Sequence, residues 1–151
     1  MDWNAIQQYL PLYQKAAVLT VRLGVAGIIF AIIIGLACAV IQYDKVPVLR
    51  QIVGVYIQLS RNTPLLVQLF LVYYGLAQFD SIRSSFMWTY LRDPFWCATA
   101  TMTLHTAAYI AEILRGAIQA IPPGELEAAR ALGMSKTQTL FYITLPRAAR
   151  I

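Results

Sequence analysis

The side chains of this chain that could do chemistry are few, and their spacing favours contact with other proteins over catalysis. His105 is the single histidine, and Cys38 and Cys97 lie far apart within apolar stretches. Neither a metal site nor a disulfide framework is indicated by that spacing. No serine, cysteine or carboxylate pair is placed as a nucleophile or as a general acid and base. We therefore expect a non-catalytic protein that needs no cofactor and no metal.

The most informative pattern lies in residues 122–146 and predicts two short helices joined by a tight turn. The run Pro-Pro-Gly at 122–124 ends the preceding helix, and Glu125 and Glu127 then fall in the first turn of a new one. Acidic side chains are favoured there by the helix dipole.

The end of that helix and the start of the next are also marked by residue type. Gly133 can adopt the left-handed conformation that ends a helix, and Ser135 with Gln138 forms a capping box for the second helix. Alanines at 128, 129 and 131 leave part of the first helix without bulky side chains. We interpret this surface as a site where another protein's backbone approaches closely.

These residues resemble the EAA loop of the permease subunits of bacterial ATP-binding-cassette (ABC) importers. Two further runs, 61–70 (RNTPLLVQLF) and 107–112 (AAYIAE) with Arg115 and Gly116, resemble the branch of that family that imports polar amino acids. The loop residues that the resemblance marks for coupling to the ATPase are Glu127, Ala128, Ala129, Gly133, Ile143, Leu145 and Pro146.

The resemblance implies a permease subunit in the bacterial inner membrane that carries an amino acid. Its expected partners are a separate ABC ATPase subunit, a second permease that is identical or a sister, and an extracytoplasmic substrate-binding protein. The chain has no phosphate-cradling Gly-rich loop with Lys, so ATP hydrolysis is expected in the partner. Permeases of this branch continue past the loop with further spanning helices, so we expect residues 1–151 to be the N-terminal part of a longer subunit.

Composition independently predicts a membrane protein. Hydrophobic residues make up 59% of the chain and charged residues 13%, and the mean hydropathy is +0.60. Residues 23–41 are uncharged and, as a helix, would measure about 28 Å, close to the hydrocarbon thickness of a bilayer. With 64–79 and 95–113 as two further spans, the predicted fold is all-α, with three spanning helices and a cytoplasmic helix-turn-helix-like loop in a single domain.

The distribution of basic residues predicts the orientation of these spans. Basic residues are fewer in the regions assigned outside, Lys15, Arg83 and Arg92, than in the regions assigned inside, which hold Lys45, Arg50, Arg61, Arg115, Arg130, Lys136, Arg147 and Arg150. The positive-inside rule then places the N-terminus outside and the loop in the cytoplasm.

Shorter elements follow from local signals. Within residues 1–17, apolar residues at helical spacing predict a short amphipathic helix in the outer interface, although Pro11 is unfavourable within a helix. Residues 49–60 are expected to form a helix packed along the inner face. Thr63 is expected to cap the next helix with its side chain, and Pro64 to occupy its first position.

Polar residues inside the predicted spans have two interpretations. His105, Tyr109 and Glu112 share one helical face, and Gln68 and Tyr73 lie in the second span, so all five are candidates for a translocation path. Packing between helices that satisfies their own polar groups explains them equally well. Glu112 and Arg115, three residues apart, are expected to form an ion pair.

Two other classes of protein remain as alternatives. Helix, glycine turn and helix is also the pattern of a DNA-binding helix-turn-helix, which would make the chain a membrane-tethered regulator. The second helix carries few basic residues for phosphates, which favours a permease without nucleic acid. A pore or small structural membrane protein is the third reading.

Overall fold

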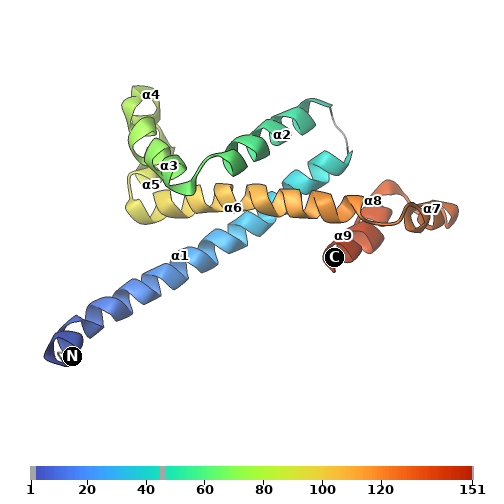
Figure 1. Cartoon of the computed structure of the whole chain (residues 1–151). Coiled ribbons are helices and arrows are strands. Elements are labelled where there is room, and N and C mark those ends of the chain that lie inside the picture. The colour runs from blue at the N-terminus through green and yellow to red at the C-terminus, as the bar shows by residue number, and fades with distance from the viewer. Residues whose placement is uncertain (1–2, 45–46, 151) are drawn as a thin grey trace.

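The computed structural model describes residues 3–44 and 47–150, and within these residues it is built from helices and turns without a strand. The predicted all-α class is confirmed. Two long helices, α1 (Trp3–Asp44) and α6 (Pro94–Gln119), cross and pack on each other, and α2 (Pro47–Asn62) packs against both (Figure 1).

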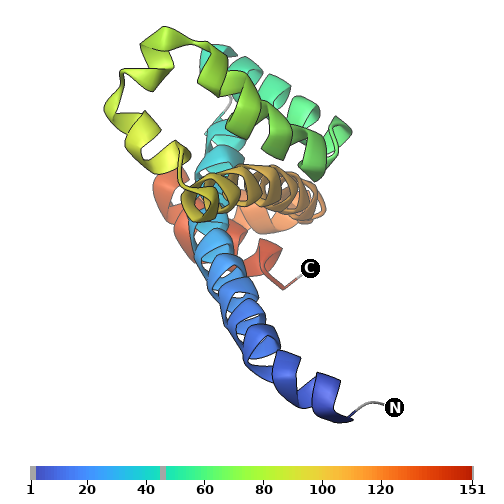
Figure 2. The same ribbon diagram turned by 90° about the vertical axis from the view of Figure 1, so that its left-hand side faces the viewer.

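Helix α1 is longer at both ends than the predicted span 23–41. Its segment Tyr9–Tyr43 is, within the described residues, the one helix both long and apolar enough to cross a membrane. The predicted separate helix in residues 1–17 is wrong, because from Trp3 onward these residues continue into α1 with Pro11 inside the helix. A proline removes one backbone donor but does not end a helix whose remaining turns are intact. The N-terminal part of α1 extends away from the other elements (Figures 1 and 2).

Small residues explain how α1 and α6 approach each other. Along α1, four buried residues recur at a spacing of four: Gly27, Ala31, Gly35 and Ala39. A Cβ added at Gly35 would lie 2.7 Å from Cγ2 of Ile110 and 3.0 Å from the carbonyl oxygen of Ala107 on α6. Where both helices are lined by small side chains, their backbones pack closely, which is a common way of joining helices in membranes.

Helix α2 lies against the middle of α6. Val53 and Ile57 are buried in a cluster with Cys38, Ala108 and Ala111. The hydroxyl of Tyr56 donates a hydrogen bond to the carbonyl of Leu104. The predicted helix at 49–60 is therefore present within α2, and its apolar stripe is buried against α1 and α6.

The predicted helix at 64–79 is a succession of shorter pieces. It begins with α3 (Leu65–Phe70), continues as a π-helical turn (Leu71–Gly75) and ends in a 3₁₀ turn (Leu76–Gln78). The expected side-chain cap by Thr63 is absent. Instead, the Gln68 amide nitrogen donates to the carbonyls of Ser60 (2.8 Å) and Thr63 (3.0 Å), which ties the end of α2 to the start of α3.

Two short helices, α4 (Asp80–Arg83) and α5 (Phe86–Leu91), lead to α6. The start of α6 is fixed by Asp93, whose carboxylate accepts from the backbone amides of Phe95 (2.9 Å) and Trp96 (3.2 Å). This is an N-cap followed by proline at the first helical position. Helix α6 then runs six residues beyond the predicted end at Ile113, to Gln119.

Candidate functional site

The residues predicted to couple to another protein lie together beyond the end of α6. They form α7 (Pro123–Ala131), a turn, α8 (Lys136–Thr139), a π-helical turn (Leu140–Thr144) and α9 (Leu145–Ala148). We call residues 122–148 the loop unit. It projects from the C-terminal end of α6, and its last helix turns back beside that end (Figure 1).

Gly133 forms the turn after α7 in the conformation that the sequence predicts. Its φ is 75°, in the left-handed region. The Gly133 amide donates to the Arg130 carbonyl (2.9 Å), and the Met134 amide reaches the Ala129 carbonyl (3.1 Å). These two bonds are those of a Schellman motif, which satisfies the last carbonyls of a helix. The chain can change direction at Gly133 because glycine has no Cβ that would clash in the left-handed region.

The predicted capping box is also present. The Ser135 backbone amide donates to the Gln138 side-chain oxygen (2.8 Å), and the Gln138 amide donates to the Ser135 hydroxyl oxygen (3.2 Å). The pair satisfies donors at the start of α8 that would otherwise lack partners. The turn between α7 and α8 is thus fixed from both sides by local hydrogen bonds.

The alanines of α7 do not all face outward. Ala129 is 1% exposed and lies in the interior of the loop unit, while Glu127 and Ala128 are exposed. Since successive helical residues are rotated by about 100°, Ala131 and Leu132 share the outward side with Glu127 and Ala128. We call these four residues the α7 face. Leu132 is 81% exposed.

A charged pair closes the loop unit across its two ends. The Arg147 guanidinium on α9 donates three hydrogen bonds of 2.7–3.2 Å to the Glu125 carboxylate on α7. These bonds lower the pKa of the Glu125 carboxyl below its usual range and raise that of Arg147. This pairing could not be predicted from local sequence patterns, because the two residues are 22 positions apart.

The later residues of the loop pattern have mixed exposure. Ile143 and Leu145 are partly buried, whereas Pro146 is exposed. The buried side chains of this part, which no spacing argument had marked, are Thr139 (6% exposed), Leu140 (4%), Thr144 (0%) and Ala148 (5%). The π-helical turn directly before Pro146 shifts the backbone bonding pattern at the point where proline supplies no amide.

A second group of predicted residues meets on α6. The rings of His105 and Tyr109 lie 5.1 Å apart, and the Tyr109 hydroxyl donates to the Arg61 carbonyl (3.4 Å). The Arg61 guanidinium lies 5.8 Å from the centre of the Tyr109 ring and 3.2 Å from the Glu112 carboxylate. Arg61 belongs to α2 and was not among the predicted site residues, because nothing local to its sequence indicates a partner 51 positions away.

The expected Glu112–Arg115 ion pair is present. The Arg115 guanidinium donates to both Glu112 oxygens, at 2.7 and 2.8 Å. Glu112 is therefore shared between Arg115 on its own helix and Arg61 on α2. We call His105, Tyr109, Glu112, Arg61 and Arg115 the α6 polar cluster.

Gln68 and Tyr73 lie in different surroundings. Gln68 borders a cavity of about 630 Å³ that it shares with Tyr56 and Leu104. Tyr73 packs edge-on against Tyr74, with ring centres 5.0 Å apart, and lines a hollow beside Cys97. The structure thus brings three of the five predicted path residues together and places these two elsewhere.

An all-helical fold, in whose described residues the segment Tyr9–Tyr43 is long and apolar enough to cross a membrane, fits a membrane component. Residues 27–151 match the family described as binding-protein-dependent transport system inner membrane component. The chain belongs to this family.

Named relatives agree with the match. The chain is 40% identical, over 97% of its length, to the octopine transport system permease protein OccM of Rhizobium radiobacter. It is 43% identical, over 93% of its length, to the arginine ABC transporter permease protein ArtM of Escherichia coli strain K12. A crystal structure of an amino acid ABC transporter with histidines matches 99% of the chain, with a TM-score of 0.82 and 31% identity.

The chain spans part of the length of these proteins. It covers 57% of OccM, 64% of ArtM and 66% of the matched chain in the crystal structure.

The alternative of a DNA-binding regulator is overturned by the family match over residues 27–151.

Proposed function

We propose that this chain is the permease subunit of an ATP-driven importer of polar amino acids, and that its loop unit docks on a separate ATPase subunit. The relatives support the class of cargo. Their names refer to octopine, arginine and, for a 35% identical protein of Bacillus subtilis, L-cystine. All three are amino acids or built from them, so the transported molecule is expected to carry charged amino and carboxyl groups.

The observation that carries the docking proposal is the α7 face. It combines an acidic group at Glu127, small side chains at Ala128 and Ala131 and an 81% exposed Leu132. An exposed apolar side chain beside small ones fits a groove on a partner, where it can anchor the contact. The Schellman turn and the Glu125–Arg147 pair hold this face as one body with α9, which contacts α6. Movement of the partner would therefore be passed to α6.

In this proposal residues 23–41 of α1, the segment 64–79 and residues 95–113 of α6 cross the membrane, with the N-terminus outside and the loop unit in the cytoplasm. The eight basic residues assigned inside support that orientation. Glu112, Arg61 and Tyr109 of the α6 polar cluster are then candidates for the path of the amino acid, with His105, Gln68 and Tyr73 along its sides. A second permease and an extracytoplasmic binding protein complete the importer.

Leu132→Asp tests the docking. The variant is expressed together with the ATPase subunit encoded for the same importer, and the ATPase that co-purifies is measured. We expect the ATPase to be lost, since a carboxylate would have to be desolvated in an apolar groove. Met87→Asp on α5 is the matched control, because Met87 is also well exposed, at 64%, but lies at the other end of α6. Equal retention of the ATPase by both variants would contradict the docking.

Import itself is tested by uptake of radiolabelled polar amino acids into vesicles that hold the complete importer and ATP. Orientation is tested separately, with a reporter cysteine at Ser81 or Lys136 in a Cys38→Ser, Cys97→Ser background. A membrane-impermeant thiol reagent should label the first in intact cells and spare the second. Labelling in the opposite pattern would reject the cytoplasmic placement of the loop unit.

A further inference from the structure

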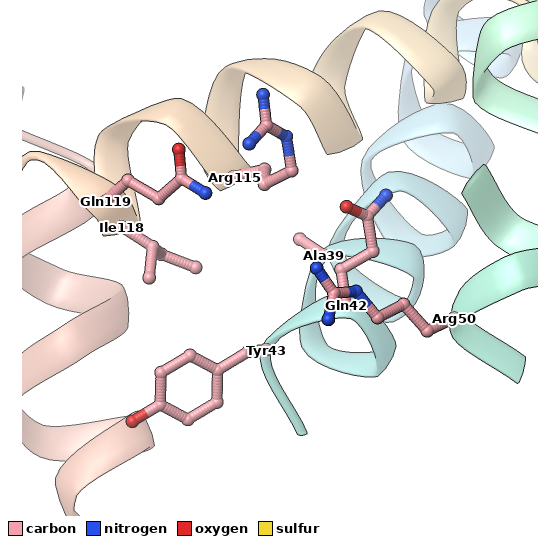
Figure 3. A pocket seen from close by; sticks show the side chains of 7 residues that line it. All are labelled: Ala39, Gln42, Tyr43, Arg50, Arg115, Ile118 and Gln119. Atoms are coloured by element: carbon pink, nitrogen blue, oxygen red, sulfur yellow. The ribbon is translucent and has the colours of Figure 1, made fainter. Parts of the chain in front are cut away.

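A small pocket with both polar and apolar lining lies where the ends of α1 and α6 meet the beginning of α2 (Figure 3). Its volume is about 180 Å³. The polar part of its lining consists of Gln42 and Tyr43 from α1, Arg50 from α2, and Arg115 and Gln119 from α6. The guanidinium groups of Arg50 and Arg115 come from different helices, and the two glutamine amides lie beside them (Figure 3).

The charge around this pocket is not balanced. Within the described part of the chain, Arg50 forms no ion pair, while Arg115 and Arg61 share the one carboxylate of Glu112. The guanidinium groups of Arg50, Arg61 and Arg115 thus have one carboxylate, that of Glu112, among the described side chains. Arg115 uses its Nε and Nη2 atoms on Glu112. Its Nη1 group has no partner among the residues that the structure describes.

Asp44 and Lys45 follow Tyr43 in the sequence and have opposite formal charges, and their side chains are not among those that the structure describes. The C-terminal ends of α1 and α6 carry partial negative charge, and the N-terminal turn of α2 carries partial positive charge. The attraction for an anion therefore comes mainly from Arg50 and Arg115.

The donors that line the pocket fit a phosphate group. Guanidinium groups match the oxygens of phosphate in a bidentate geometry. The amides of Gln42 and Gln119 can each donate a further hydrogen bond, whereas the hydroxyl of Tyr43 points away from the two arginines (Figure 3). Two cations and two neutral donors at a small pocket suit a compact anion with several acceptor oxygens.

The position of the pocket along α1 indicates where the phosphate comes from. In the turns before it, α1 exposes Ile32 (50%) and Ile33 (60%). Such apolar surface on a membrane helix faces acyl chains, while tyrosine is typical of the level of the headgroups. Resting on the cytoplasmic orientation proposed above, the pocket lies at the headgroups of the inner leaflet, where anionic lipids meet basic pockets between helices.

We propose that this pocket binds a phosphate group, and that an anionic phospholipid headgroup supplies it. The bound lipid bridges α1, α2 and α6 at their cytoplasmic ends. The test measures the phosphatidylglycerol and phosphatidylcholine retained by the importer, by native mass spectrometry after purification from mixed vesicles of the two. The proteins are the wild type, Arg50→Gln and Arg50→Lys, with Arg92→Gln, an exposed arginine before α6, as the matched control.

We expect Arg50→Gln to retain about fivefold less phosphatidylglycerol, the effect of removing one basic residue near an anionic surface. Phosphatidylcholine should not change, Arg50→Lys should keep most of the binding, and Arg92→Gln should match the wild type. If Arg50→Gln does not yield folded protein, Gln119→Leu tests the same pocket. Equal retention of phosphatidylglycerol by all variants would overturn the proposal.

Excess inorganic phosphate separates the two sources of the group. If phosphate displaces the phosphatidylglycerol that depends on Arg50, recognition of a phosphate group is supported. If the wild type binds inorganic phosphate through Arg50 but retains no lipid, the lipid is overturned as the source of the group. Lipid retention is measured without ATP or amino acid. A complex that holds the lipid but does not transport would therefore count against the proposed import alone.

Discussion

Glu125 at the start of α7 and Arg147 on α9 are joined by three hydrogen bonds, although 22 positions separate them in the chain. The pair closes the loop unit into a ring whose other side is the Gly133 turn. Its effect is geometric: it sets the angle between α7, which carries the exposed face, and α9, which contacts α6.

Exchanging the two charges tests this role. Glu125→Arg alone should loosen the loop unit, because it places two cations together, and should speed its cleavage by chymotrypsin, whose sites the exchange leaves unchanged, relative to a cut elsewhere in the chain. Arg147→Glu added to it should restore the slower cleavage, since the ion pair is rebuilt in reverse. If the double variant is cleaved as fast as the single one, the pair does not hold the loop unit.

The same pair predicts a dependence on pH. The pKa of Glu125 is lowered by its hydrogen bonds to Arg147, so the pair stabilises the folded loop above the ordinary carboxyl pKa. That contribution is lost as the pH falls through the lowered pKa in the folded state. Hydrogen exchange in α7 should rise relative to α6 on acidification, and Glu125→Gln should remove this difference. A difference that persists in Glu125→Gln would assign it to another group.

Adjacent alanines on α7 should respond differently to the same substitution. Ala128→Trp places a large side chain on the exposed α7 face and should abolish association with the ATPase while the loop unit stays folded. Ala129 is 1% exposed, so Ala129→Trp should overpack the interior, at a cost of about 1–3 kcal/mol. Thermal unfolding and co-purification, measured on both variants, check this. A stable Ala129→Trp protein would contradict the burial of this residue.

Gly133 should accept asparagine better than valine. Its φ of 75° costs a side-chain-bearing residue about 1–2 kcal/mol, and asparagine tolerates this region better than a β-branched residue. No atom lies within 4 Å of an added Cβ, so the cost comes from the backbone conformation. Gly133→Asn should keep ATPase association and Gly133→Val should reduce it. Equal loss in both would point to a steric contact instead.

Gly35 tests the packing of the two long helices. An added Cβ would lie 2.7 Å from the Ile110 side chain, so Gly35→Ala should lower the melting temperature of the detergent-solubilised protein. Gly24→Ala, where no atom lies within 4 Å, should leave it unchanged or raise it, because alanine is the better helix former. A lower melting temperature for both variants would show that the contact at Ile110 is not the cause.

Local chemistry predicted the elements whose ends depend on neighbouring residues. The Gly133 turn and the Ser135–Gln138 box are settled within a few positions, and both are found in the structure. The ion pair of Glu112 with Arg115 could also be predicted locally, because the two residues are three positions apart on one helix.

The remaining features depend on contacts between elements. The direction of Ala129, the pairing of Glu112 with Arg61 and the closure of the loop by Arg147 require knowledge of which helix faces meet. To predict that α1 is continuous, one would have to know that the helix tolerates Pro11 in its interior. For that reason the sequence analysis assigned Ala129 to an exposed surface, whereas the structure buries it.

Gln68 shows how one such contact limits chemistry. Its side-chain nitrogen carries two hydrogens, and the carbonyls of Ser60 and Thr63 accept from it. Rotating the amide by 180° would bring its oxygen against those two carbonyl oxygens, so the orientation is fixed by repulsion. Both hydrogens are engaged, and the side chain meets the adjoining cavity as a hydrogen-bond acceptor alone. An ammonium group can bind to such an oxygen, whereas a carboxylate is repelled by it.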